Sequence, residues 1–133
     1  MSRNSGFTLI ELIIVIIILG LLAAVGLPRM LGLQSRAKDS ATRGALGAIR
    51  AAIANEQAKN AVSGNTAFPA TLQASFFPGS IMPSEQVSGA TGAAANATVA
   101  VTGVGAITGT AGGWAYNAAS GRVWVNHSSY TSY

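Results

Sequence analysis

The pattern of apolar and polar positions divides the chain into three parts. An almost unbroken apolar run extends from Phe7 to Leu27, and Glu11 is its only ionisable residue. Apolar residues then recur with helical spacing to about Val62, and short β-prone runs follow among many small and polar residues. At about 1.5 Å per residue, the 21 positions of the first run can cross a ~30 Å hydrocarbon layer as a helix. The first part is therefore predicted to span a membrane.

The second part is predicted to continue the same helix with one apolar face. Leu46, Ile49 and Ile53 follow one another at spacings of three and four residues, and Ser63-Gly64-Asn65 supplies a stop. A helix from Phe7 to about Val62 would be roughly 80 Å long. Its first half would need a membrane or other chains around it, and its second half would need its own globular head.

The third part is predicted to form a small sheet after a long loop. Four runs have β-prone composition: residues 97–102, 104–108, 113–117 and 122–126. The last two are predicted to form a hairpin, because Trp114 and Tyr116 alternate with small residues and the turn-like Ala118-Ala119-Ser120-Gly121 comes next. We expect four aliphatic residues to pack on the helix: Val99, Val101, Val104 and Ile107. The predicted fold is α+β, with a long N-terminal helix packed through its second half on a small C-terminal antiparallel sheet.

The junction between the polar start and the apolar run resembles a known processing site. Gly6 followed by Phe7-Thr8-Leu9-Ile10-Glu11 is similar to the N-terminus of type IV pilins and of the related pseudopilins of type II secretion. The resemblance implies that a prepilin peptidase cuts after Gly6 and N-methylates Phe7. Unlike a secretory signal, in which the apolar region is removed, this arrangement keeps the apolar run in the mature chain.

The expected organisation follows from the pattern and the resemblance together. It comprises a leader at 1–6, a transmembrane and assembly helix at 7–28, an amphipathic helix at 29–62, and a β head at 63–133 whose connecting loop covers 63–96. The resemblance implies a structural subunit of a type IV pilus that serves adhesion, motility or surface attachment. It would be stored in the inner membrane and polymerised through its N-terminal helix by an inner-membrane assembly platform.

Two other functions remain open from the sequence. The chain could be a pseudopilin of a type II secretion system, which would form a periplasmic pseudopilus rather than an extracellular pilus. Alternatively, it could be an uncleaved, membrane-anchored binding module. Cleavage after Gly6 separates the last alternative from the other two, because a plain anchor has no need of it.

Glu11 is the residue of the apolar run most in need of a partner. A carboxylate in a lipid-facing helix is unfavourable by a few kcal/mol, and in a plain anchor this one would have no evident role. Cleavage would create an α-amine on Phe7 that could pair with Glu11 of the same chain or of a neighbour. In pilins the corresponding glutamate is held to neutralise the amine of a neighbouring subunit.

Gly20 and Pro28 enclose a segment that could kink or unwind on assembly, although membrane helices also tolerate both residue types.

Four arginines recur every seven residues after the apolar run: Arg29, Arg36, Arg43 and Arg50. Seven steps on a helix drift by only about 20°, so these side chains form a slowly winding stripe. Asp39 could pair with either Arg36 or Arg43 of this stripe. The stripe is either a solvated flank or an intersubunit contact. Nucleic acid is not an expected partner, because no aromatic residues are interleaved with the arginines. Their position also conflicts with the positive-inside rule, since the resemblance implies that this side of the segment leaves the cytoplasm.

The remaining composition offers little chemistry for a site. One His, no Cys and four acidic residues accompany a formal net charge of +4. His127 has no acidic residue near it in sequence, and no nucleophile motif or phosphate loop is present. No acidic residue follows Glu85, so the calcium site of major pseudopilins lacks its usual carboxylates. The C-terminal disulfide of many pilins is also absent, because the chain has no Cys. We therefore expect no enzyme activity, no metal and no cofactor.

Overall fold

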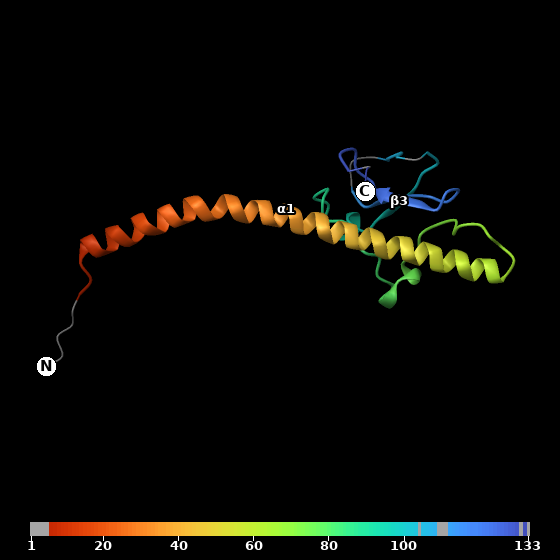
Figure 1. The fold of residues 1–133 in the computed structure, drawn as a ribbon, viewed down its shortest axis with the longest axis horizontal. Coiled ribbons are helices and arrows are strands. Elements are labelled where there is room, and N and C mark those ends of the chain that lie inside the picture. Colours follow the sequence, from red (N-terminus) through yellow and green to blue (C-terminus); the bar gives the residue numbers. More distant parts are fainter. Residues whose placement is uncertain (1–5, 104, 109–111, 131, 133) are drawn as a thin grey trace. The chain divides into compact units, whose positions relative to one another are not determined.

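The computed structural model describes residues 6–103, 105–108, 112–130 and 132, and contains one long helix followed by a small sheet (Figure 1). Helix α1 covers Leu9–Val62, and the strands are β1 (Thr98–Ala100), β2 (Trp114–Asn117) and β3 (Arg122–Val125). Three short 3₁₀ helices lie between α1 and the sheet: η1 (Ala74–Phe76), η2 (Pro78–Ser80) and η3 (Gly92–Ala94). The predicted α+β fold is confirmed. The chain divides into two compact units, Met1–Arg36 and Ala37–Tyr133, which are described separately below.

In the first unit, the helix continues through both of its weak positions. α1 runs without interruption past Gly20 and Pro28. Proline is tolerated there because its fixed φ suits a helix, at the cost of one backbone hydrogen bond. Unwinding of the segment 21–27 in an assembled filament therefore stays a prediction about another state of the chain.

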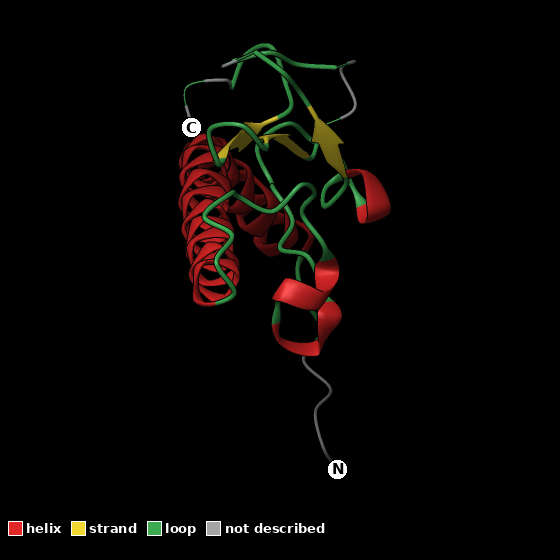
Figure 2. Cartoon of the chain, turned by 90° about the vertical axis from the view of Figure 1, so that its right-hand side faces the viewer, coloured by secondary structure: helices red, strands yellow, loops and turns green. Residues whose placement is uncertain are grey.

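In the second unit, the predicted apolar face of α1 forms one side of the core. Leu46, Ile49 and Ile53 are all buried, at 3% exposure or less. They pack with sheet and loop residues in one cluster that includes Leu72, Phe77, Met82, Trp114, Tyr116, Val123 and Val125. Figure 2 shows the strands and the long loops gathered beside the helix. The spacing of three and four residues thus identified the buried helix face correctly.

The sheet has the order β1-β2-β3 and mixes two kinds of pairing. β2 and β3 form the predicted antiparallel hairpin, with Trp114 opposite Val125. β1 pairs parallel to β2, with Thr98 opposite Trp114, so the sheet is not antiparallel throughout as expected. The expected strand at 104–108 is absent over 105–108, and Val104 lies outside the described residues. Thirteen residues separate Ala100 from Trp114, which is long enough for the crossover connection that parallel strands need.

The face of the sheet that meets the helix consists of aromatic residues of β2 and valines of β3 rather than residues of β1. Trp114 and Tyr116 belong to the cluster that contains the helix residues, whereas Val99 and Val101 pack with Ala115 and Trp124 in a separate cluster. The expectation that these two valines pack on the helix was therefore wrong. The reason is the register: Val99 lies opposite Ala115, and alternation along β2 directs Ala115 away from Trp114 and Tyr116.

The loop between helix and sheet is held by polar atoms of the same aromatic residues. Trp114 Nε1 donates to the Pro83 carbonyl at 2.7 Å, and Tyr116 Oη donates to the Pro69 carbonyl at 2.7 Å. Phe77, from the same loop, is buried in the core cluster. The long loop is therefore part of the folded head.

Candidate processing and assembly segment

The predicted processing site lies just before the helix begins. Gly6, Phe7 and Thr8 are exposed and non-helical, and α1 starts at Leu9. Residues 1–5 of the expected leader lie outside the described residues. The structure therefore presents the Gly6–Phe7 bond at the surface, next to the first helical turn.

Thr8 and Glu11 together cap this helix start. The Glu11 backbone N–H donates to Thr8 Oγ1 at 3.3 Å, and the Thr8 hydroxyl donates to Glu11 Oε2 at 3.5 Å. A Thr followed three residues later by Glu is the sequence of a capping box, in which side chains satisfy the free N–H groups of a helix end. We did not identify this cap from the sequence, although the Thr-x-x-Glu spacing was there to find it.

The cap corrects the expectation that Glu11 would have no role in a plain membrane anchor. A carboxylate in the first turn also interacts favourably with the helix dipole, so Glu11 has a structural role in a single chain. In the uncleaved chain the Phe7 nitrogen is a peptide nitrogen, and a charge pair between Phe7 and Glu11 requires cleavage first. The cap with Thr8 therefore needs no cleavage, whereas a charge pair with the Phe7 amine does.

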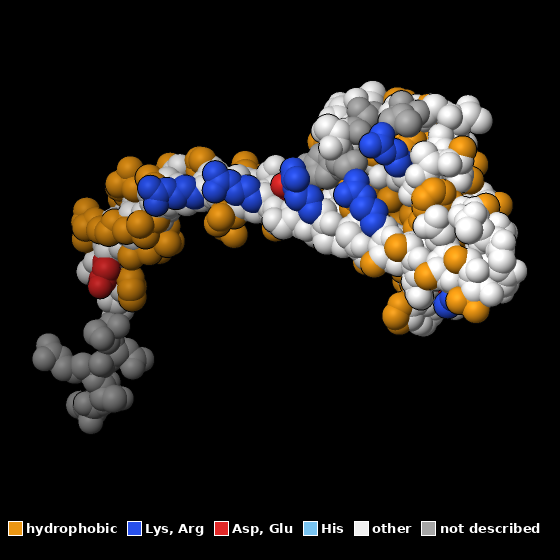
Figure 3. Space-filling model, turned by 45° about the vertical axis from the view of Figure 1, so that its right-hand side comes forward, with side chains coloured by type: hydrophobic (Ala, Val, Ile, Leu, Met, Phe, Trp, Pro, Cys, Tyr) orange, Lys and Arg blue, Asp and Glu red, His pale blue; other side chains and the backbone are white. Residues whose placement is uncertain are grey.

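The helix that follows exposes apolar side chains on every side. Leu9 and Phe7 are each 76% exposed, and even Ile13 is 38% exposed. Figure 3 shows hydrophobic side chains gathered near this end of the helix. Among the described residues, α1 is long and apolar enough to cross a membrane. A helix that is apolar all round needs lipid or other chains as its surroundings.

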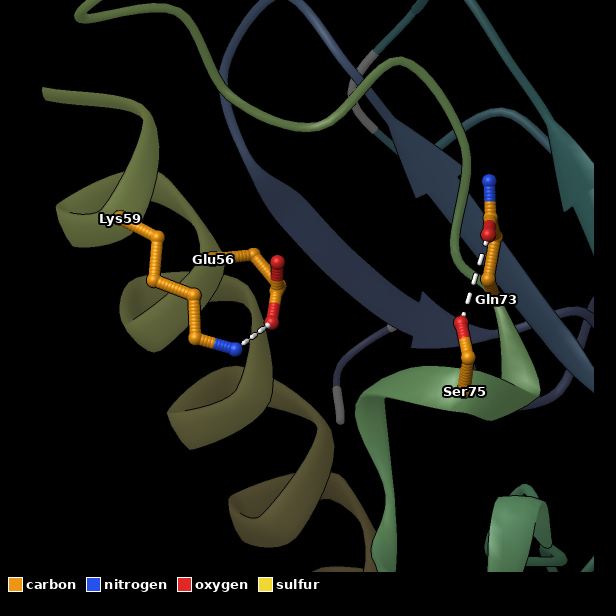
Figure 4. A network of polar contacts seen from close by, with 4 residues as sticks. All are labelled: Glu56, Lys59, Gln73 and Ser75. Carbon is orange, nitrogen blue, oxygen red and sulfur yellow. Dashed lines mark hydrogen bonds and ion pairs between the residues drawn. The ribbon is translucent and has the colours of Figure 1, made fainter. Parts of the chain in front are cut away.

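The four arginines of the stripe are exposed, but they do not have the same contacts. Arg43 Nε lies 3.1 Å from Asp39 Oδ2, which settles the predicted choice of partner for Asp39 in favour of Arg43. In the part of the chain that the structure describes, Arg29, Arg36 and Arg50 have no ion-pair partner. A second ion pair joins Lys59 Nζ to Glu56 Oε1 at 2.5 Å near the end of α1 (Figure 4). The same figure shows the Ser75 hydroxyl donating to the Gln73 side chain in the following loop.

A buried carboxylate in the loop was not anticipated from the sequence. Glu85 is fully buried, and its side chain accepts hydrogen bonds from the backbone N–H groups of Val87 and Ser88, each at 3.0 Å, and from the Ser88 hydroxyl. Gly113 N–H adds a contact of 3.3 Å from the start of β2. The neighbouring Gln86 N–H donates to buried Thr42 Oγ1 of α1 at 2.9 Å. This arrangement links loop, helix and sheet, and is structural in character.

The single histidine takes part in local contacts. The ring centroids of His127 and Tyr130 are 5.2 Å apart, and Ser129 N–H donates to His127 Nδ1 at 3.2 Å. Within residues 6–103, 105–108, 112–130 and 132, no group of three or more His, Cys, Asp or Glu side chains could hold a metal ion. These residues show no assembled catalytic set around His127.

Comparison with known proteins gives a family match at the N-terminus and relatives that match part of the chain. Residues 1–27 match the family described as the prokaryotic N-terminal methylation motif. The chain is 49% identical over 47 residues to the type IV major pilin protein PilA of Myxococcus xanthus, which is 35% of this chain and 21% of that protein. It is 38% identical over 71 residues to the type II secretion system core protein G of Pseudomonas aeruginosa, 53% of this chain and 46% of that protein.

A third relative is the type IV narrow pilus major component PilA5 of Thermus thermophilus, 46% identical over 59 residues, 43% of this chain and 51% of that protein. No solved structure gives a significant match. The chain thus spans between about a fifth and a half of the length of these relatives. It carries the prokaryotic N-terminal methylation motif and is similar, over part of its length, to type IV pilins and to a type II secretion core protein.

Proposed function

We propose that this chain is a structural subunit of a type IV pilus, stored in the inner membrane and polymerised through α1 into a helical filament. The observation that carries the proposal is a methylation motif directly followed by a helix whose apolar side chains are exposed on all sides. The similarity to two pilus components supports the same function. The filament would be a homo-oligomer, and a prepilin peptidase and an assembly platform would be its processing and assembly partners.

Transfer of α1 from lipid to a filament core gains little from the hydrophobic effect alone, because lipid tails are as apolar as leucine side chains. The fit between neighbouring helices and the pairing of polar groups must then make the association of subunits specific. Cleavage after Gly6 would give Phe7 a charged amine, and Glu11 of a neighbouring subunit would neutralise it inside an apolar core, where an unpaired charge is costly. Gly20 and Pro28 would let the helix adjust locally, and the arginine stripe from Arg29 to Arg50 would face neighbouring subunits.

The first test is the mass of the mature chain. Intact-mass and N-terminal peptide spectrometry on protein purified from its native cell should show a start at Phe7 carrying one added methyl group. A chain that retains residues 1–6 without a methyl group would contradict the proposal and identify an uncleaved anchor. Imaging of surface preparations then separates a pilus from a periplasmic pseudopilus, the second candidate, which the similarity to core protein G favours.

The second test concerns the charge of Glu11. Glu11→Ala should leave membrane insertion intact but lower the yield of filaments by at least about tenfold, because burying an unpaired amine costs more than 1.4 kcal/mol. The measurement is the ratio of sheared filaments to membrane-bound subunit.

Two matched variants separate this charge from the helix cap. Glu11→Gln keeps a residue that can complete a capping box but lacks the charge, so it should assemble as poorly as Glu11→Ala. Thr8→Ala removes the capping hydroxyl but keeps the charge, and should assemble far better. Normal filament yield from Glu11→Gln would show that the carboxylate charge is not needed.

A further inference from the structure

Arg29 and Arg36 stand where the apolar surface of α1 ends, in the first compact unit of the chain. Both side chains are exposed, and neither has an ion-pair partner among the described residues. Glu11, the only described acidic residue of this unit, lies 18 positions before Arg29, about 27 Å along the helix axis. Asp39 lies three residues after Arg36 on the same helix, but its carboxylate pairs with Arg43.

Three of the side chains between the two arginines are large, apolar and exposed. Met30, Leu31 and Leu33 are 71%, 64% and 65% exposed. Exposed apolar side chains interspersed with unpaired cations are typical of a helix segment at a membrane surface, where the apolar groups enter the interface and the cations meet the headgroups. A helix flank that only faces water would have no reason to expose these three large side chains.

The dimensions place the start of the Arg29 side chain within a headgroup layer and that of Arg36 about 7 Å beyond it. If the span ends at Leu27, Arg29 begins about 3 Å and Arg36 about 14 Å beyond the hydrocarbon edge, and the headgroup region is roughly 5–7 Å thick on each side. Helical side chains lean toward the N-terminus of their helix, which directs both long arginine side chains back toward the bilayer. Seven residues apart, the two also lie on nearly the same helix face.

We propose that, in the membrane-stored chain, Arg29 and Arg36 bind the phosphate groups of anionic lipids at the C-terminal end of the span. This inference rests on the membrane-stored stage of the proposed function. Guanidinium groups bind phosphate oxygens in a bidentate manner, and cations near an anionic bilayer surface are attracted to it. The contact also explains why arginines follow the span on the side where the positive-inside rule disfavours them. Arg43 differs from this pair, because it already has Asp39 as its partner.

The test measures lipid preference on the full-length chain reconstituted in bilayers of phosphatidylcholine with a minor fraction of phosphatidylglycerol. Spin-labelled forms of the two lipids report the relative association constant at the protein surface. The wild-type chain should prefer phosphatidylglycerol by roughly fivefold for each contributing arginine at moderate ionic strength, and less at high salt. The double variant Arg29→Gln/Arg36→Gln should lose most of this preference.

Two controls make the result specific. Arg43→Gln/Arg50→Gln removes the same charge from the second compact unit and should keep the preference, as should Arg29→Lys/Arg36→Lys, which retains both charges. An unchanged preference in Arg29→Gln/Arg36→Gln would overturn the proposal. Filament yield is scored separately: if this variant loses filaments but keeps the lipid preference, the two arginines act between subunits and the lipid contact is refuted, while the pilus function stands.

Discussion

At the scale of single residues, the head relies on aromatic side chains with polar tips. Trp114, Tyr116 and Trp124 are each at most 4% exposed, and each donates a hydrogen bond to a loop carbonyl, from Pro83, Pro69 and Ala106 respectively. Such residues add apolar contact area to a small core and hold a loop with the same atoms. Among the described residues, no buried side-chain nitrogen or oxygen lacks a hydrogen-bond partner.

Tyr116 makes this role testable through pH. Burial raises the pKa of its phenol above the usual value near 10. The unfolded chain therefore loses this proton at lower pH than the folded chain does. The contribution of Tyr116 to stability is complete below about pH 10 and falls as pH rises through the folded pKa. Tyr116→Phe should lower the free energy of unfolding by about 1–2 kcal/mol at pH 7, because the Pro69 carbonyl loses its donor. The variant should also show a smaller fall of this free energy above about pH 10.

The measurement is urea unfolding followed by tryptophan fluorescence from pH 7 to 11, on wild type and Tyr116→Phe in the same bilayer or detergent. The two proteins share every other residue, so only the difference between their two curves reports on the Tyr116 phenol. Parallel curves above pH 10 would rule out a coupling between the Tyr116 phenol and folding.

At the scale of elements, local patterns were predictable and the pairing of distant segments was not. The helix face at Leu46, Ile49 and Ile53 and the hairpin of β2 with β3 depend on spacing within a short stretch, which the sequence displays directly. The parallel pairing of β1 with β2 joins partners 16 positions apart, such as Thr98 and Trp114. The links from the buried Glu85 to Gly113 and from Gln86 to Thr42 join segments 28 and 44 positions apart, and no local pattern announces them.

The hairpin turn provides an element-level prediction. Gly121 has φ of +66°, and a Cβ at this position would overlap the ring of Phe68 from the loop after α1. Gly121→Ala should therefore destabilise the head by roughly 2–3 kcal/mol, through both the left-handed backbone and the clash.

Gly44→Ala is the matched control for that variant. Gly44 lies within α1, and a Cβ there would meet nothing within 4 Å. The same substitution should stabilise the head by up to about 1 kcal/mol, because alanine is the better helix former. Urea midpoints by tryptophan fluorescence give both values, and equal midpoints for Gly121→Ala and wild type would refute the turn requirement.

At the scale of the whole molecule, α1 performs two tasks with two kinds of surface. From Ala37 onward its apolar face is buried in the head, whereas the apolar residues of the first unit are exposed and need a partner outside the chain. This division was predictable, because an apolar run of 21 residues far exceeds what a small head can cover. The cap formed by Thr8 and Glu11 was not predicted, since the sequence argument considered only the cost of Glu11 in lipid and its pairing with the Phe7 amine.

That cap has a consequence for the proteolytic enzyme that would process the chain. A peptidase must draw its substrate into an extended strand to expose the carbonyl it attacks, and a helical bond would have to be unwound first. Thr8 caps the N-terminal end of α1, which begins at Leu9. The Gly6–Phe7 bond therefore stays outside the hydrogen-bonded ladder of α1. The threonine that caps α1 thereby leaves the Gly6–Phe7 bond, one residue further toward the N-terminus, open to hydrolysis.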